Sequence, residues 1–97
     1  PFPPDDPKRI FSLTKDACDF IKRQTESEKP FYLQISHYAV HLKQMGLQKT
    51  VDKYTAKKRG KFHHRPVFAA CTEDLDSGIG MILDLVEDLG ICRIMED

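Results

Sequence analysis

Two histidines four residues apart, His37 and His41, are the residues of this sequence with the clearest capacity for chemistry. On a helix, this spacing would place both imidazoles on one face, as a pair of metal ligands requires. They end the segment KPFYLQISHYAVH, residues 29–41, in which a proline precedes an aromatic and β-branched run. That run predicts a short strand over 31–36, and a strand end does not align side chains four residues apart. We therefore expect no metal pair, and the sequence contains no HExxH motif.

The position of the two histidines still suggests a ligand site. A run that is apolar on both faces is typical of a buried strand in a parallel sheet. Ligands of open α/β sheets bind beside the C-terminal ends of such strands. For His37, the sequence favours a structural role, packed at the strand end and hydrogen-bonded to the backbone. For His41, residue type alone favours an exposed loop histidine.

Three helices are predicted around this strand. Ser12 can cap the first, which should fade near Gln24. A short helix is expected over about 47–54. The last should run from Pro66, well placed in a first turn, to about residue 89, with Gly90 as its stop.

Small residues inside these helices suggest close packing. Gly78 and Gly80 each cost about 1 kcal/mol of helix propensity, which close approach to a neighbouring element would explain. Cys18 and Cys71 fall on apolar helix positions, where a thiol behaves as a small hydrophobe. Cys92 completes an odd number of cysteines without CxxC spacing, which indicates neither a zinc knuckle nor a disulfide framework.

Charge distribution leaves two surface segments open to two interpretations each. Fifteen basic and fifteen acidic residues cancel, so nothing suggests nucleic acid as a partner, and no apolar run is long enough for a membrane span. The basic segment KKRGKFHHRP, residues 57–66, is either an anion-binding rim or a solvated loop. The carboxylates of residues 73–76 are either a metal site or, more simply, solvent-facing groups on one helix.

The order of elements predicts a fold of the α/β class. One buried strand has no partner within the chain, apart from a weak second strand in ICRIMED, residues 91–97. We therefore expect residues 1–97 to be an internal segment of a single larger domain, with 1–11 as the loop that leads into it. Such a slice would expose apolar surface, which predicts an oligomer or packing against other parts of the domain.

The chain resembles a known family, the type I sulfatases of the alkaline-phosphatase-like superfamily. The resemblance covers residues 6–90 and is carried by KPFYLQISHYAVH, by VDKY at 51–54, and by PVFAACTEDLDSGIGMILDLVEDLG at 66–90. It implies a three-layer α/β sandwich with a mostly parallel sheet between helices. It also implies hydrolysis of sulfate esters, with a formylglycine hydrate as nucleophile and a calcium ion that holds the sulfate.

The resemblance assigns roles to residues near the predicted strand end. The family's substrate-contacting histidine falls on His41, which would hydrogen-bond the sulfate and can protonate the leaving oxygen. Lys43, where many members have proline, is a second candidate substrate contact. The formylglycine motif and the calcium ligands are absent, so both are expected only in a full-length member. This segment alone should hold no metal and be inactive.

Several wider expectations follow from the resemblance. The substrate would be a sulfated small molecule or glycan, and the location would be secreted, periplasmic or lysosomal. Two alternatives stay open at this point. One is a non-catalytic α/β binding or interaction module, and the other is a phosphatase or phosphodiesterase of the same superfamily.

Overall fold

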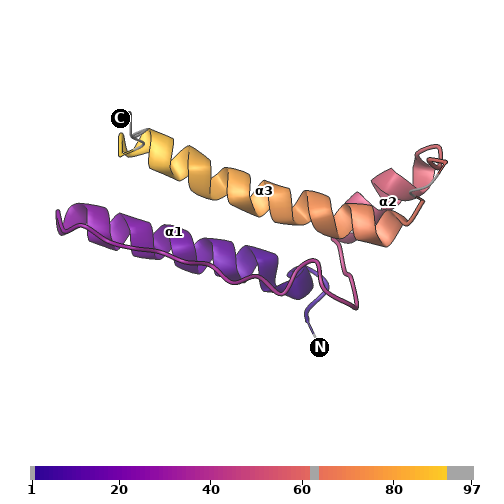
Figure 1. Cartoon of the computed structure of the whole chain (residues 1–97), viewed down its shortest axis with the longest axis horizontal. Coiled ribbons are helices and arrows are strands. Elements are labelled where there is room, and N and C mark those ends of the chain that lie inside the picture. The colour runs from indigo at the N-terminus through magenta and orange to yellow at the C-terminus, as the bar shows by residue number, and fades with distance from the viewer. Residues whose placement is uncertain (1, 62–63, 92–97) are drawn as a thin grey trace.

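The computed structural model describes residues 2–61 and 64–91. Its elements, in chain order, are a 3-10 turn η1 (Pro7–Arg9) and the helices α1 (Ile10–Glu26), α2 (Gln48–Ala56) and α3 (Pro66–Asp88). α1 and α3 run in the same direction side by side, and α2 packs beside the N-terminal part of α3 (Figure 1). The chain is flat, with principal extents of 47 × 34 × 20 Å.

The predicted α/β class is wrong for this chain, because the described residues contain helices and no strand or sheet. Residues 31–36 are extended, yet they pair with no other backbone segment and instead run back along α1 (Figure 1). Phe31 meets Phe20 of α1 edge to face, with ring centroids 5.7 Å apart. Apart from residue 91, the weak second strand expected over 91–97 lies outside the described residues.

Burial along the extended segment alternates, which differs from the strand covered on both sides that we predicted. Leu33 and Ile35 are half-buried toward α1, whereas Tyr32 is 82% exposed. An extended chain turns successive side chains to opposite sides, so a single helix beneath it covers every second residue. Because α1 covers only one side of this segment, the side chains on its other side are exposed.

α1 begins at Ile10, two residues before Ser12, the predicted cap. Its first turn is capped by Asp6, the residue that directly precedes η1. Asp6 accepts hydrogen bonds from the backbone N–H groups of Phe11 (3.0 Å) and Ser12 (3.1 Å), and from the Ser12 hydroxyl. Burial raises the pKa of Asp6, but these hydrogen bonds and the charge of Arg9 outweigh it and hold the pKa below its ordinary value. Asp6, rather than the predicted Ser12, therefore caps the start of α1.

α3 follows the prediction closely and packs tightly against α1 at Gly78. Pro66 is its first residue, and Gly90 follows it with φ +70°, the left-handed conformation that ends a helix. A Cβ on Gly78 would lie 2.6 Å from Thr14 Oγ1 of α1, whereas a Cβ on Gly80 would meet nothing within 4 Å. Close approach therefore explains Gly78 but not Gly80.

The buried core is small and lies between these helices. Cys71 is fully buried, as predicted for a small hydrophobe, and Cys18 is half-buried. Its other fully or nearly fully buried apolar members are Ile10, Ala17, Ile21 and Ala70. The opposite side of α3 leaves Phe68, Ile79 and Leu83 exposed, the last at 62%. Packing of this chain against another chain or another part of the domain stays a prediction.

Candidate functional site

The two candidate substrate contacts, His41 and Lys43, are both exposed on the turn that follows the extended segment. The backbone N–H of His41 donates to the carbonyl of Tyr38 at 3.1 Å and closes the turn. His41 Nδ1 lies 3.3 Å from the carbonyl oxygen of Leu42. His41 is therefore presented to solvent just after an extended run, where the sequence placed it.

Two long side chains hold this turn in place from outside. The Lys8 ammonium donates to the carbonyl of Leu42 at 3.3 Å, across 34 positions of the sequence. The Gln44 amide donates to the carbonyl of Val40 at 2.9 Å, and its oxygen accepts a longer contact of 3.4 Å from Arg65. The carbonyl of Leu42 is thus held by Lys8 of η1, and the carbonyl of Val40 is held by Gln44, just after the turn.

Lys8 is an unusual anchor because its side chain is only 5% exposed. Its ammonium also lies 5.4 Å from the centroid of the Phe2 ring, a cation–π distance. A buried charge is costly unless dipoles or rings solvate it, so Lys8 has a strong preference for keeping the Leu42 carbonyl within reach. This preference favours one position of the turn that carries His41.

His37 is half-buried beside the extended segment, which agrees with a structural role. Its Nε2 is buried and has no hydrogen-bond partner among the described residues, so the expected bond to the backbone is not found at that atom. The turn separates His37 from His41, and the two do not share a helix face. In the described ranges, no group of three or more His, Cys, Asp and Glu side chains could hold a metal ion.

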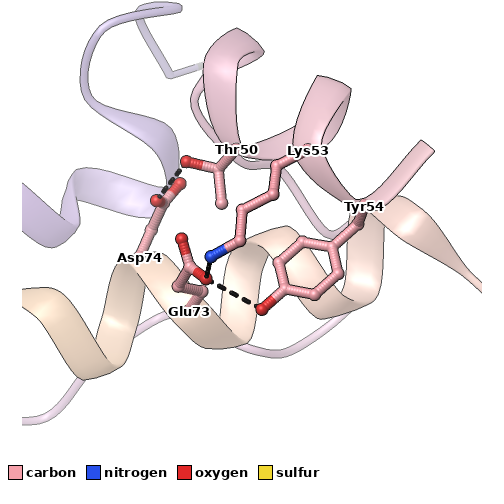
Figure 2. A network of polar contacts seen from close by, with 5 residues as sticks. All are labelled: Thr50, Lys53, Tyr54, Glu73 and Asp74. Atoms are coloured by element: carbon pink, nitrogen blue, oxygen red, sulfur yellow. Dashed lines mark hydrogen bonds and ion pairs between the residues drawn. The ribbon is translucent and has the colours of Figure 1, made fainter. Parts of the chain in front are cut away.

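Two acidic residues of α3, Glu73 and Asp74, form a polar contact with α2 (Figure 2). Asp74 is 2% exposed, accepting from the backbone N–H of Leu47 at 2.6 Å and from the Thr50 hydroxyl at 2.8 Å. The expectation that these carboxylates face solvent is therefore wrong for Asp74. Leu47 cannot cap α2 with its own side chain, so the carboxylate of another helix satisfies the start of α2.

Glu73 makes the second contact across the same pair of helices. Its Oε1 accepts from Lys53 Nζ at 2.6 Å and from the Tyr54 hydroxyl at 2.8 Å (Figure 2). The hydrogen bond from Lys53, followed by that from Tyr54, lowers the pKa of Glu73 below its ordinary value. The side-chain oxygens of Asp74 and Oε1 of Glu73 are thus committed to α2. They do not fit the ligand set of a calcium ion, which takes several free oxygens.

The cysteine nearest the turn is not a reactive thiol. Cys71 is fully buried, and this burial raises its pKa, although a backbone hydrogen bond at Met45 and the charge of Lys8 partly offset the rise. A raised pKa keeps the sulfur protonated, and the thiolate is the nucleophilic form. Cys71 therefore contributes packing, as its apolar helix position predicted.

The roles of three residues that shape this region were not predicted from the sequence: Lys8, Gln44 and Asp74. Asp74 had a signal, since a helix that starts after leucine needs a capping group from elsewhere. Lys8 and Gln44 had none, because their partners are backbone carbonyls of a turn whose course is not encoded by residue type. Within the described residues, no helix combines the length and apolar character that a membrane span needs.

Comparisons with known proteins support one relationship. A sulfatase of Formosa agariphila is 32% identical to this chain over 84 residues, which is 84% of this chain and 15% of the relative. The chain therefore spans about a seventh of the length of the curated relative that it matches. No protein-family model matches the chain, and no solved structure matches it. The similarity supports a sulfatase-like relationship over most of this sequence.

Proposed function

We propose that this chain is part of a sulfuric ester hydrolase, a sulfatase, that cleaves the sulfate ester of a small molecule or glycan. The observation that carries the proposal is the 32% identity to a sulfatase over 84 residues. Because the chain matches only 15% of that relative, the activity belongs to a longer protein. A secreted, periplasmic or lysosomal location is part of the same proposal.

Within that protein, His41 is proposed to bind the sulfate group. Its exposed imidazole on an anchored turn supports this role, since a group that must meet a substrate needs both access and a fixed position. An imidazolium supplies a charge-assisted hydrogen bond to an anion, and the same proton can pass to the leaving oxygen near neutral pH. Lys43, exposed on the same turn, is proposed as a second positive charge for the sulfate.

The nucleophile and the metal ion are proposed to come from elsewhere in the longer protein. A formylglycine nucleophile and a calcium ion would supply attack on sulfur and charge neutralisation of the sulfate. Burial of Cys71 and the engagement of Asp74 with α2 support a source for both groups outside this chain. The chain's own contribution is to bind the sulfate and to deliver a proton through His41.

No observation favours the two alternatives, a phosphatase or phosphodiesterase of the same superfamily and a non-catalytic binding or interaction module. The first test of the proposal is the sequence of the longer protein on either side of this chain. A Cys/Ser-x-Pro/Ala-x-Arg motif upstream and an Asp-Asn-Gly downstream are expected, and a Thr or Ser nucleophile with zinc ligands would contradict the sulfatase.

The second test is activity of the longer protein. It should hydrolyse 4-nitrophenyl sulfate much faster than 4-nitrophenyl phosphate, while residues 1–97 alone should hydrolyse neither. Faster cleavage of the phosphate, or turnover of the sulfate by residues 1–97 alone, would reject the proposal as stated.

A further inference from the structure

The end of α2 and the start of α3 lie close together (Figure 1). The described residues of the basic segment, 57–61 and 64–66, lie at this corner, and several of them line a small hollow. This hollow has a volume of about 260 Å³. Its charged and aromatic lining consists of Tyr54, Lys57, Lys58, Arg59, His64 and Arg65. The described residues that line it include no carboxylate, although the chain as a whole has as many acidic as basic residues.

The cations around the hollow have few competing partners. Lys58 and Arg59 are exposed and form no ion pair within the part of the chain that the structure describes. Within the described ranges, the Arg65 guanidinium has a hydrogen bond to the neutral amide oxygen of Gln44 and no ion pair. An oxyanion in the hollow would therefore not have to displace an existing salt bridge.

The ring of Tyr54 orders one side of the hollow. Lys57 Nζ lies 5.6 Å from the centroid of this ring, and the Tyr54 hydroxyl is held by Glu73. A cation on an aromatic face is positioned with less loss of freedom than a solvated lysine. Lys57 is thus a pre-positioned charge at the hollow, whereas Lys53, which lies over the same ring, is bonded to Glu73.

The start of α3 and the end of α2, like the cations, favour a negative charge at this corner. α3 starts at Pro66 with no side-chain cap and no acidic residue in its first turn, so the positive end of its dipole is uncompensated. The carbonyl end of α2 is negative, but Lys57 follows it directly and offsets that charge. The helix ends and the lining cations therefore favour an anion at the corner, and the nearby Glu73 carboxylate is bonded to Lys53 and Tyr54.

A larger neighbouring hollow of about 800 Å³ shares Tyr54, His64, Arg65 and Ala69 with the small one. Its lining differs because Glu73 and Asp76 contribute carboxylates, which repel an anion. The contrast assigns an anionic group to the small hollow alone.

From these observations we propose that the corner between α2 and α3 binds one oxyanion group, a sulfate or phosphate, as the free ion or as an ester. The site uses residues other than His41 and Lys43, and it does not rest on the proposed sulfatase activity. Binding at exposed cations is screened by salt, so the affinity should fall as ionic strength rises.

The experiment is an amide NMR titration of residues 1–97 with sodium sulfate, sodium phosphate and glucose 6-sulfate, with ionic strength held constant by sodium chloride. Saturable shifts are expected at the amides of residues 57–60, 64–65 and 67–69 with the free ions, the ester or both. Tighter binding of glucose 6-sulfate would identify the ester as the ligand form, and equal or tighter binding of the ions would identify the free ion. Linear shifts that never saturate with any of the three overturn the proposal.

Charge variants separate this site from general electrostatics. K58Q/R59Q should weaken binding by about 5- to 10-fold, since each exposed charge pair is worth up to about 1 kcal/mol. The matched control K22Q/K49Q removes two exposed charges outside the hollow and should change the affinity less than twofold. Equal weakening by both pairs, or loss of binding in His41→Ala with the corner intact, would overturn the assignment.

Discussion

The carboxylate of Asp74 accepts a 2.8 Å hydrogen bond from the hydroxyl of Thr50, and both side chains are buried, at 2% and 4% exposure. The residues lie on α3 and α2, so this contact fixes the orientation of one helix on the other (Figure 2). The second oxygen of Asp74 caps α2 at Leu47. One carboxylate therefore joins the start of α2, its first turn and the middle of α3.

Replacement of Asp74 by Asn should destabilise the chain by about 1–3 kcal/mol, because a buried donor loses its charged acceptor. Asn keeps the shape but offers one acceptor in place of two, and its NH₂ group faces an N–H or hydroxyl donor. Urea unfolding followed by circular dichroism measures the change. Asp76→Asn, two positions along α3 and exposed, is the control and should shift stability by less than about 0.5 kcal/mol. Equal effects of the two variants would contradict the role of Asp74.

Two glycines of α3 should respond in opposite directions to alanine. At Gly78, the new Cβ would lie 2.6 Å from Thr14 Oγ1 and 3.1 Å from Ile10 Cγ2, so α1 and α3 must separate. We expect a net loss of about 1–3 kcal/mol. At Gly80 the Cβ meets nothing within 4 Å, and alanine should stabilise the helix by up to about 1 kcal/mol. Thermal unfolding of both variants checks the pair, and a stabilised Gly78→Ala would reject the close contact.

Lys8 should act as a positioning residue for the turn that carries His41. Lys8→Met keeps the buried stem but removes the donor to the Leu42 carbonyl, so the turn should open more often. The His41 amide, which is bonded to Tyr38, should then exchange its hydrogen several-fold faster than in the parent chain. Lys43→Met, on the exposed side of the same turn, is the control. Unchanged exchange at His41 would show that Lys8 does not hold the turn.

Asp6 should give the chain part of its acid sensitivity. Its folded pKa is lowered, so its contribution is complete above its unfolded pKa of about 3.9 and is lost as pH falls through the folded value. The stability difference between the parent chain and Asp6→Asn should therefore shrink as pH falls from about 5 to about 2. Asp5→Asn, at an exposed neighbour, controls for net charge. A difference that stays constant with pH would contradict the capping role of Asp6.

Helix positions could be predicted because local signals determine them. Pro66 and Gly90 mark the ends of α3, and apolar spacing marks the middle of α1 and α2. The sequence predicts Ser12 as the cap of α1, whereas Asp6 supplies it. Asp6 lies four residues before the helix, and its carboxylate reaches the first turn only because the chain turns at η1.

The error in fold class has a different cause. The run at 31–36 is extended, as its residues predicted, but residue type cannot say whether another strand lies beside it. Here a helix lies on one side, with Phe20 against Phe31, and Tyr32 is in solvent. The turn after the run could be located for the same local reasons, whereas its anchors Lys8 and Gln44 depend on tertiary packing.

The proposed role of His41 is tested most directly by the kinetics of His41 variants in the longer protein, with 4-nitrophenyl sulfate as substrate. His41→Ala should lower kcat/KM by about 10²- to 10⁴-fold, the range for loss of a general acid, with the fold retained. Gln34→Ala, exposed on the same extended segment, should retain activity within about twofold. Near-normal kcat/KM in His41→Ala would remove His41 from the sulfate site and contradict the proposed mechanism.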